Sequence, residues 1–159
     1  MAEMLSDDPV FVSSVHYRDP AAAVEFLERA FGFELTMAIE GPPDAPEMCH
    51  YEMALAGRGR VMVGGEFESR VRSPASVDGV NTQRLHVQLT GEIEAHCEHA
   101  RAAGAEIIME PEGQFYGDVS YRALDPEGHS WTFAVHVRDV TKAEAEAAIG
   151  VPITSTTWR

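Results

Sequence analysis

The sequence has few basic residues, and this shortage excludes several kinds of partner. Only 12 lysines and arginines accompany 26 aspartates and glutamates in 159 residues, which gives a formal charge of −14. An acidic surface repels the phosphates of nucleic acids and of anionic membranes, so we expect neither as a partner. The same charge favours cationic small molecules, although a surface that only keeps the protein soluble is the simpler explanation.

Cysteines and long apolar runs are also scarce. Cys49 and Cys97 lack CxxC spacing and fall in predicted regular elements, where buried free thiols are common. No run approaches the roughly 20 apolar residues that span a bilayer. The acidic first residues, MAEMLSDD, lack the basic start and apolar core of a signal peptide. These features predict a cytoplasmic protein.

An internal repeat organises the chain. Residues 19–37 (DPAAAVEFLERAFGFELTM) align without a gap on residues 91–109 (GEIEAHCEHARAAGAEIIM), at an offset of 72 (91 − 19 = 72). Each copy reads as strand, helix, glycine and strand, and two more strands follow. The repeat predicts an α+β protein with a first βαβββ module at 9–65, a linker at 66–81, a second module at 82–138, and a C-terminal helix and tail at 139–159.

Local signals predict where the elements begin and end. Asp19 and Pro20 mark a helix start and Gly32 its end, and Gly104 ends a second helix over 92–103. Alternating apolar residues and turn sequences predict strands at 10–17, 33–40, 48–55, 60–64, 84–90, 119–124 and 130–137. A short helix is expected at 141–148.

Three stretches carry a resemblance to a known family: DPAAAVEFLERAFGFEL (19–35), HARAAGAEII (99–108) and YGDVSYRALDPEGHSW (116–131). They resemble the vicinal-oxygen-chelate superfamily, the glyoxalase/bleomycin-resistance/dioxygenase group, and within it a bacterial PhnB-like, bleomycin-resistance-like subgroup. The resemblance implies two tandem βαβββ modules that form a curled mixed sheet around a cavity. It also implies a homodimer, because the family commonly completes the cavity across a two-fold axis.

Metal-using members of that family place His or Glu ligands on the first and fourth strands of each half. Carried over to this chain, the positions fall at Val12, Val63, around His86 and at Thr132. Valine has no donor atom and threonine is a weak ligand, so we expect no metal cofactor. A displaced site for a divalent ion such as Zn, Ni, Mn or Fe, formed by His50, Glu52 and His86, is the alternative.

The alternation of side chains along the strands predicts which of them face the cavity. Polar residues share one face of each strand, opposite the bulky apolar residues. Aligning the two closing hairpins at Gly59 and Gly128, at an offset of 69, places Tyr121 on the cavity side unless a bulge intervenes. The predicted cavity residues are Ser14, His16, His50, Glu52, Arg84, His86, Gln88, Tyr121 and Thr132.

Two functions agree with these observations. The first is a binding protein without a metal, which takes up a small organic molecule, cationic or aromatic, and sequesters a drug or metabolite. The second is a lyase, isomerase or dioxygenase of the same superfamily, either metal-free or dependent on the displaced site. No catalytic residue is assigned. His96 and His99 are interpreted as exposed helix residues, and His129 as a hairpin residue that forms local hydrogen bonds. Arg84 and Arg122 could each meet a substrate carboxylate or pair with acidic neighbours.

Overall fold

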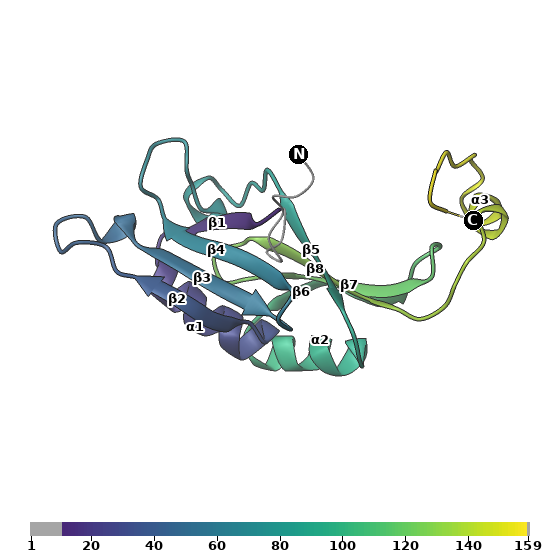
Figure 1. Cartoon of the computed structure of the whole chain (residues 1–159), viewed down its shortest axis with the longest axis horizontal. Coiled ribbons are helices and arrows are strands. Elements are labelled where there is room, and N and C mark those ends of the chain that lie inside the picture. The colour runs from purple at the N-terminus through teal and green to yellow at the C-terminus, as the bar shows by residue number, and fades with distance from the viewer. Residues whose placement is uncertain (1–10, 159) are drawn as a thin grey trace, which may run out of the picture.

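The computed structural model describes residues 11–158 (Figure 1). The acidic residues 1–8, the predicted start of the first module at 9 and of its strand at 10, and Arg159 lie outside this range. The first module contains β1 (Ser13–Tyr17), α1 (Pro20–Phe31), β2 (Glu34–Ile39), β3 (His50–Leu55) and β4 (Gly59–Gly65). The second contains β5 (Arg84–Leu89), α2 (Ile93–Ala102), β6 (Glu106–Gly113), β7 (Asp118–Leu124) and β8 (Ser130–His136), and α3 (Lys142–Ile149) follows.

The first helix shows why the repeat folds as it does. The Asp19 carboxylate caps α1 by accepting a hydrogen bond from the Ala22 amide at 3.1 Å, and Pro20 occupies the first turn. Gly32 ends the helix with a φ of 77°, a left-handed conformation that glycine adopts without steric cost. The predicted helix boundaries are therefore those of the structure.

The strands form two separate four-stranded sheets, with orders β1-β4-β3-β2 and β5-β8-β7-β6. In each sheet the first strand of the module is parallel to the last, and the other neighbours are antiparallel. This confirms the α+β fold of two βαβββ modules. Neither sheet closes into a barrel.

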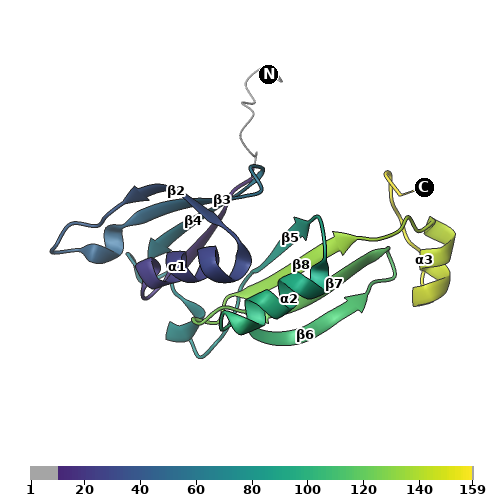
Figure 2. The ribbon, with the colours of Figure 1, turned by 90° about the horizontal axis from the view of Figure 1, so that it is seen from below.

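The hydrophobic core extends through both modules. Helices α1 and α2 lie side by side along one side of the molecule, while α3 lies at the opposite end from α1 (Figures 1 and 2). Phe31, at the end of α1, contacts the rings of Trp131 and Phe133 on β8, with centroid distances of 5.5 and 4.8 Å. The two modules therefore bury one shared core rather than two independent ones.

Hydrogen bonds also join the modules at the hairpin between β7 and β8. Buried Asp125 accepts from the Tyr17 hydroxyl at 2.7 Å and from the Trp131 indole at 3.0 Å. Glu127 accepts from the backbone amides of residues 18 and 19 at the start of α1. The backbone amide of His129 donates to Asp125 within the hairpin, as expected, while its side chain donates through Nε2 to the carbonyl of His16 in the other module at 2.8 Å.

Cys49 and Cys97 are free and buried. Helix α3 begins with a capping box formed by Thr141 and Glu144. Within residues 11–158, no helix has the length and apolar character needed to cross a membrane.

Candidate functional site

Each sheet has one face covered by helices and the core, and one open face. On the second sheet the register aligns His86 with Thr132 on β8, and Thr132 with Arg122 on β7. Neighbours in register point to the same side of a sheet, so these three side chains share the open face. Next to them on the same strands lie Arg84 and Ser120.

These side chains line a pocket of about 430 Å³ on the second sheet. A volume of this size suits a small organic molecule. Its lining is Arg84, His86, Met109, Gln114, Tyr116, Ser120, Arg122 and Thr132. We call this hollow the β7 pocket. Three predicted cavity residues, Arg84, His86 and Thr132, therefore meet in one place.

Two further hollows adjoin the β7 pocket. One of about 450 Å³ shares Arg84 and Arg122 with it and extends over Gly79 and residues 81–83, which precede β5. The other, about 340 Å³, lies between the modules and shares Arg84 and His86. None of the described residues that line these three hollows is an aspartate or a glutamate, although the chain contains 26 of them.

The two arginines of the β7 pocket differ from most others in the chain. Many arginines pair with carboxylates: Arg18, Arg60, Arg70, Arg72, Arg101 and Arg138. Within residues 11–158, neither Arg84 nor Arg122 has an acidic partner, and the Arg122 Nε is buried without any hydrogen-bond partner. Both residues were candidates for binding a substrate carboxylate, and only Arg84 was predicted to face the cavity.

The prediction for Tyr121 was wrong. Tyr121 is fully buried on the helix side of β7, stacked on Phe133 at 5.2 Å between centroids. The register of the two hairpins shows the cause: Glu52 pairs with Met62 and Arg122 with Thr132, so the repeat offset here is 70 rather than 69. An error of one residue exchanges the two faces of a strand, and Arg122 takes the position predicted for Tyr121.

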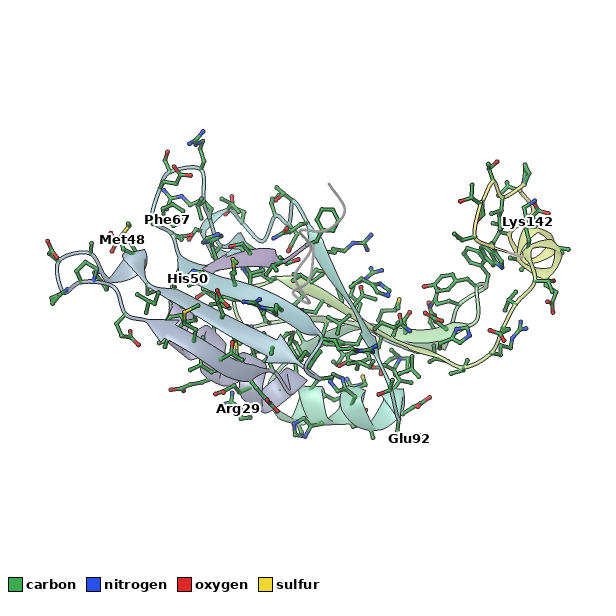
Figure 3. All side chains as sticks on the ribbon, in the orientation of Figure 1. Arg29, Met48, His50, Phe67, Glu92 and Lys142 are labelled. Atoms are coloured by element: carbon green, nitrogen blue, oxygen red, sulfur yellow. The ribbon has the colours of Figure 1, made fainter. Side chains whose placement is uncertain are left out.

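His50 and Glu52 lie on the open face of the other sheet. Their side chains are 3.4 Å apart (His50 Nε2 to Glu52 Oε1), and Arg60 binds the second carboxylate oxygen of Glu52. Hydrogen bonds from Arg60 and then His50 lower the pKa of Glu52. Figure 3 shows His50 on this face, with Met48 and Phe67 near its edge. The carboxylate is therefore held ionised, which makes it a weak proton acceptor.

The other predicted residues lie apart from the β7 pocket. Ser14 and His16 line a smaller hollow of about 180 Å³ beside the linker, where their side chains are hydrogen-bonded at 3.0 Å. Gln88 lines the hollow between the modules and donates a long hydrogen bond of 3.4 Å to Asp118. The nine predicted residues thus do not form a single site.

Of the positions that the resemblance implied for metal ligands, Val12 precedes β1 and offers no donor atom. Val63 is fully buried on the core side, so it is not a ligand position. Ser14 pairs with Met62 in the first sheet as His86 pairs with Thr132 in the second. Two hydroxyls, one thioether and one imidazole do not match the donor sets that hold divalent ions in proteins.

A second group of potential ligands lies outside the open faces. Cys97, Glu98 and Glu110 place a thiol and two carboxylates within 4.8 Å of one another. Arg101 forms ion pairs with both carboxylates, at 3.3 and 2.7 Å. Burial raises the pKa of Cys97, which disfavours the thiolate that metals prefer. This cluster is therefore an ion-pair network.

His96 is not the exposed helix residue that the sequence suggested. It lies half-buried on the inner side of α2, where its Nδ1 accepts from the Tyr121 hydroxyl at 2.7 Å and its Nε2 donates to the Phe31 carbonyl at 3.3 Å. The contact with Tyr121 needs an unprotonated Nδ1 and therefore the neutral ring, and burial lowers the pKa of His96 below its usual value of 6.5.

A pH dependence of stability follows from His96. As the pH falls below 6.5, the unfolded chain binds a proton that the folded protein does not, so the folded state loses stability between about pH 7 and pH 5. Uptake of one proton by the unfolded chain alone changes the free energy of unfolding by at most about 1.4 kcal/mol per pH unit. We expect His96→Gln to remove a fraction of this slope, because solvent screens a half-buried ring. Urea unfolding at several pH values measures it, with His99→Gln on the exposed side of α2 as the control. An unchanged slope in His96→Gln would contradict the assignment.

Comparison with known proteins agrees with this fold. TioX from Micromonospora sp. ML1 is 29% identical, with a TM-score of 0.59 over 80% of this chain and 98% of that one. TnmS3, an antibiotic binding protein from Streptomyces sp. CB03234, has a TM-score of 0.62 at 18% identity, over 84% and 98%. The uncharacterised protein Rv0887c of Mycobacterium tuberculosis is 27% identical over 135 residues, covering 82% of this chain and 76% of that protein. The model of the Glyoxalase/Bleomycin resistance protein/Dioxygenase superfamily matches residues 13–133, and the chain belongs to this family.

Proposed function

We propose that this protein binds a small organic molecule in the β7 pocket, without a metal ion. The observation that carries the proposal is the convergence of Arg84, His86, Arg122 and Thr132 on one open sheet face, around about 430 Å³ of space. Met109 and the Tyr116 ring supply apolar surface in the same lining. Binding pockets commonly combine apolar walls with a few polar groups that fix the orientation of the ligand.

The family relationship supports binding as the activity. TnmS3 shares the fold and is an antibiotic binding protein, which makes sequestration of a drug or metabolite a role that this scaffold can perform. The enzymatic alternative has less support, because Arg60 holds the Glu52 carboxylate. The side chains paired on the open faces, Ser14 with Met62 and His86 with Thr132, are also a poor set of metal donors.

We also propose that two copies associate. The open face of the first sheet exposes apolar side chains, including Met37 and Ile39, and Met48 is exposed nearby. Exposed apolar surface of this kind is typical of an association surface. Sedimentation equilibrium of the purified protein, which reads the mass directly, tests this part of the proposal.

The pocket is tested by metal analysis and a ligand screen on the same tag-free protein. After incubation with Zn²⁺, Ni²⁺, Mn²⁺ or Fe²⁺, we expect less than stoichiometric metal. In a thermal-shift screen of aromatic acids, amides and amines, we expect hits that raise the melting temperature and are lost in Thr132→Phe, which fills the pocket. His50→Ala, on the other sheet, serves as the control and should keep the hits.

Two results would contradict the proposal. Near-stoichiometric metal that disappears in His86→Ala would restore a metal site and direct attention to the lyase and dioxygenase activities of the family. If the same compounds still raise the melting temperature of the Thr132→Phe variant, they bind outside the β7 pocket.

A further inference from the structure

The charge inside the β7 pocket is opposite to the charge of the chain. The protein carries −14 overall, yet Arg84 and Arg122 line this pocket and no described lining residue is acidic. In a chain where acidic residues exceed basic ones two to one, most arginines find carboxylate partners, as six of them do here. Among the described residues neither of these two arginines has a carboxylate partner, so both bring positive charge to the pocket. Asp118 on β7 and Glu112, which pairs in register with Ser120, share this sheet face but lie outside the lining.

The environment of Arg122 indicates which kind of group would bind there. Its Nε is buried and has no hydrogen-bond partner among the described residues, and a buried donor without an acceptor is unfavourable. Nε and one terminal nitrogen form an edge of the guanidinium that matches the two oxygens of a carboxylate in a side-on pair. Beside this edge, Ser120 and Thr132 add hydroxyl donors from the neighbouring positions of β7 and β8.

The apolar residues that line the pocket indicate the chemistry of the part of the ligand that carries the anion. Met109 pairs in register with Arg122 on the adjacent strand β6, and Tyr116 lies in the loop that joins β6 to β7. A thioether and a phenol ring next to a cation suit a flat apolar group that carries the anion.

We propose that the β7 pocket is an anion subsite, in which Arg122 holds the carboxylate of an aromatic or otherwise apolar organic acid. Arg84 supplies a second positive charge, and the apolar body of the acid lies against Met109 and Tyr116. The inference rests on the proposed function, because it assigns the ligand class of the same pocket. It replaces the cationic ligand that the net charge of the sequence favoured.

The test compares two ligands of nearly the same size and shape, one with an anionic carboxylate and one with an uncharged amide. The probes are 2-naphthoate and 2-naphthamide, titrated into the full chain by NMR at about pH 8 and low salt, where histidine is mostly neutral. We expect the acid to bind the wild-type protein about tenfold more tightly than the amide, since an arginine–carboxylate pair is a strong charge-assisted interaction. In Arg122→Met the ratio should fall severalfold, with the remaining preference due to Arg84, and Arg122→Lys, which keeps the charge but not the Nε edge, should be intermediate.

The control is Arg138→Met, which removes an arginine outside the pocket that pairs with Glu144. It makes the same change in net charge and should leave the tenfold ratio intact. Spectra of the free variants verify that each is folded.

The outcomes separate this inference from the proposed function. If the amide binds the β7 pocket as tightly as the acid, the anion subsite is wrong while the pocket remains a binding site. If neither naphthyl probe nor any compound of the screen binds, both proposals fail. If inorganic phosphate displaces naphthoate at lower concentration than acetate does, the carboxylate assignment is overturned in favour of a phosphoryl group.

Discussion

Replacement of Asp125 by asparagine is expected to lower the free energy of unfolding by about 3 kcal/mol or more. The buried carboxylate accepts four hydrogen bonds: from the Tyr17 hydroxyl, the Trp131 indole, and the backbone amides of Glu127 and His129. Asparagine keeps the size of the side chain but turns one acceptor into a donor. Whichever way the amide is oriented, two donors then face an NH₂ group.

The protonation state of Tyr17 makes this loss severe. Burial, and then the charge of Asp125, raise the pKa of Tyr17 well above its usual range, so the phenol remains a donor at every pH where the protein is studied. Urea denaturation monitored by tryptophan fluorescence measures the change. Asp139→Asn, at a fully exposed side chain, is the control and should change stability by less than about 1 kcal/mol. Similar losses in the two variants would show that Asp125 does not join the modules.

The second large effect is expected for Phe31→Ala, with a loss of about 3–5 kcal/mol. Phe31 is 1% exposed, and its ring contacts Phe26, Trp131 and Phe133. Its removal leaves a cavity where α1 of the first module packs against β8 of the second, and both modules lose apolar contacts at once.

The control for this experiment is Phe11→Ala, where the same side chain is 91% exposed and little change is expected. Calorimetry gives the melting temperature and shows whether the protein still unfolds in a single transition. Two separate transitions in the wild-type protein would contradict a shared core, because each module would then unfold alone.

Most of the fold could be predicted from the sequence, because its signals are local. Asp19, Pro20 and Gly32 fix α1, and the repeat at an offset of 72 extends the assignment to the second module. Alternation along single strands also grouped Arg84, His86 and Thr132, which the register places on one face of the second sheet. These predictions need only the chemistry of a few neighbouring residues.

Predictions failed where one strand was compared with another across a turn. The loop between β3 and β4 is shorter than the loop between β7 and β8, so alignment on Gly59 and Gly128 shifted Tyr121 by one residue. The strand itself contained the correct information: Val119, Tyr121 and Ala123 alternate with Ser120 and Arg122. Reading this alternation would have placed Arg122, rather than Tyr121, on the open face.

Contacts between distant segments left no signal in the sequence. Nothing near His96 indicates that Tyr121 and the Phe31 carbonyl will become its partners. The same is true of Glu127, which accepts from the amides of residues 18 and 19 over a separation of more than one hundred residues. Such pairs follow from how the two modules pack together, and local patterns do not encode that packing.

The hydrogen bond between Tyr17 and Asp125 can form only after the second module has been synthesised. The two residues are 108 positions apart, and Phe31 precedes Trp131 by 100 (131 − 31 = 100). At about 5–20 residues per second, the first module waits roughly 5–20 s on the ribosome before its partners exist. Throughout that interval the apolar end of α1 is uncovered. A chain that terminates early inside the second module therefore keeps this apolar surface exposed and is prone to aggregate.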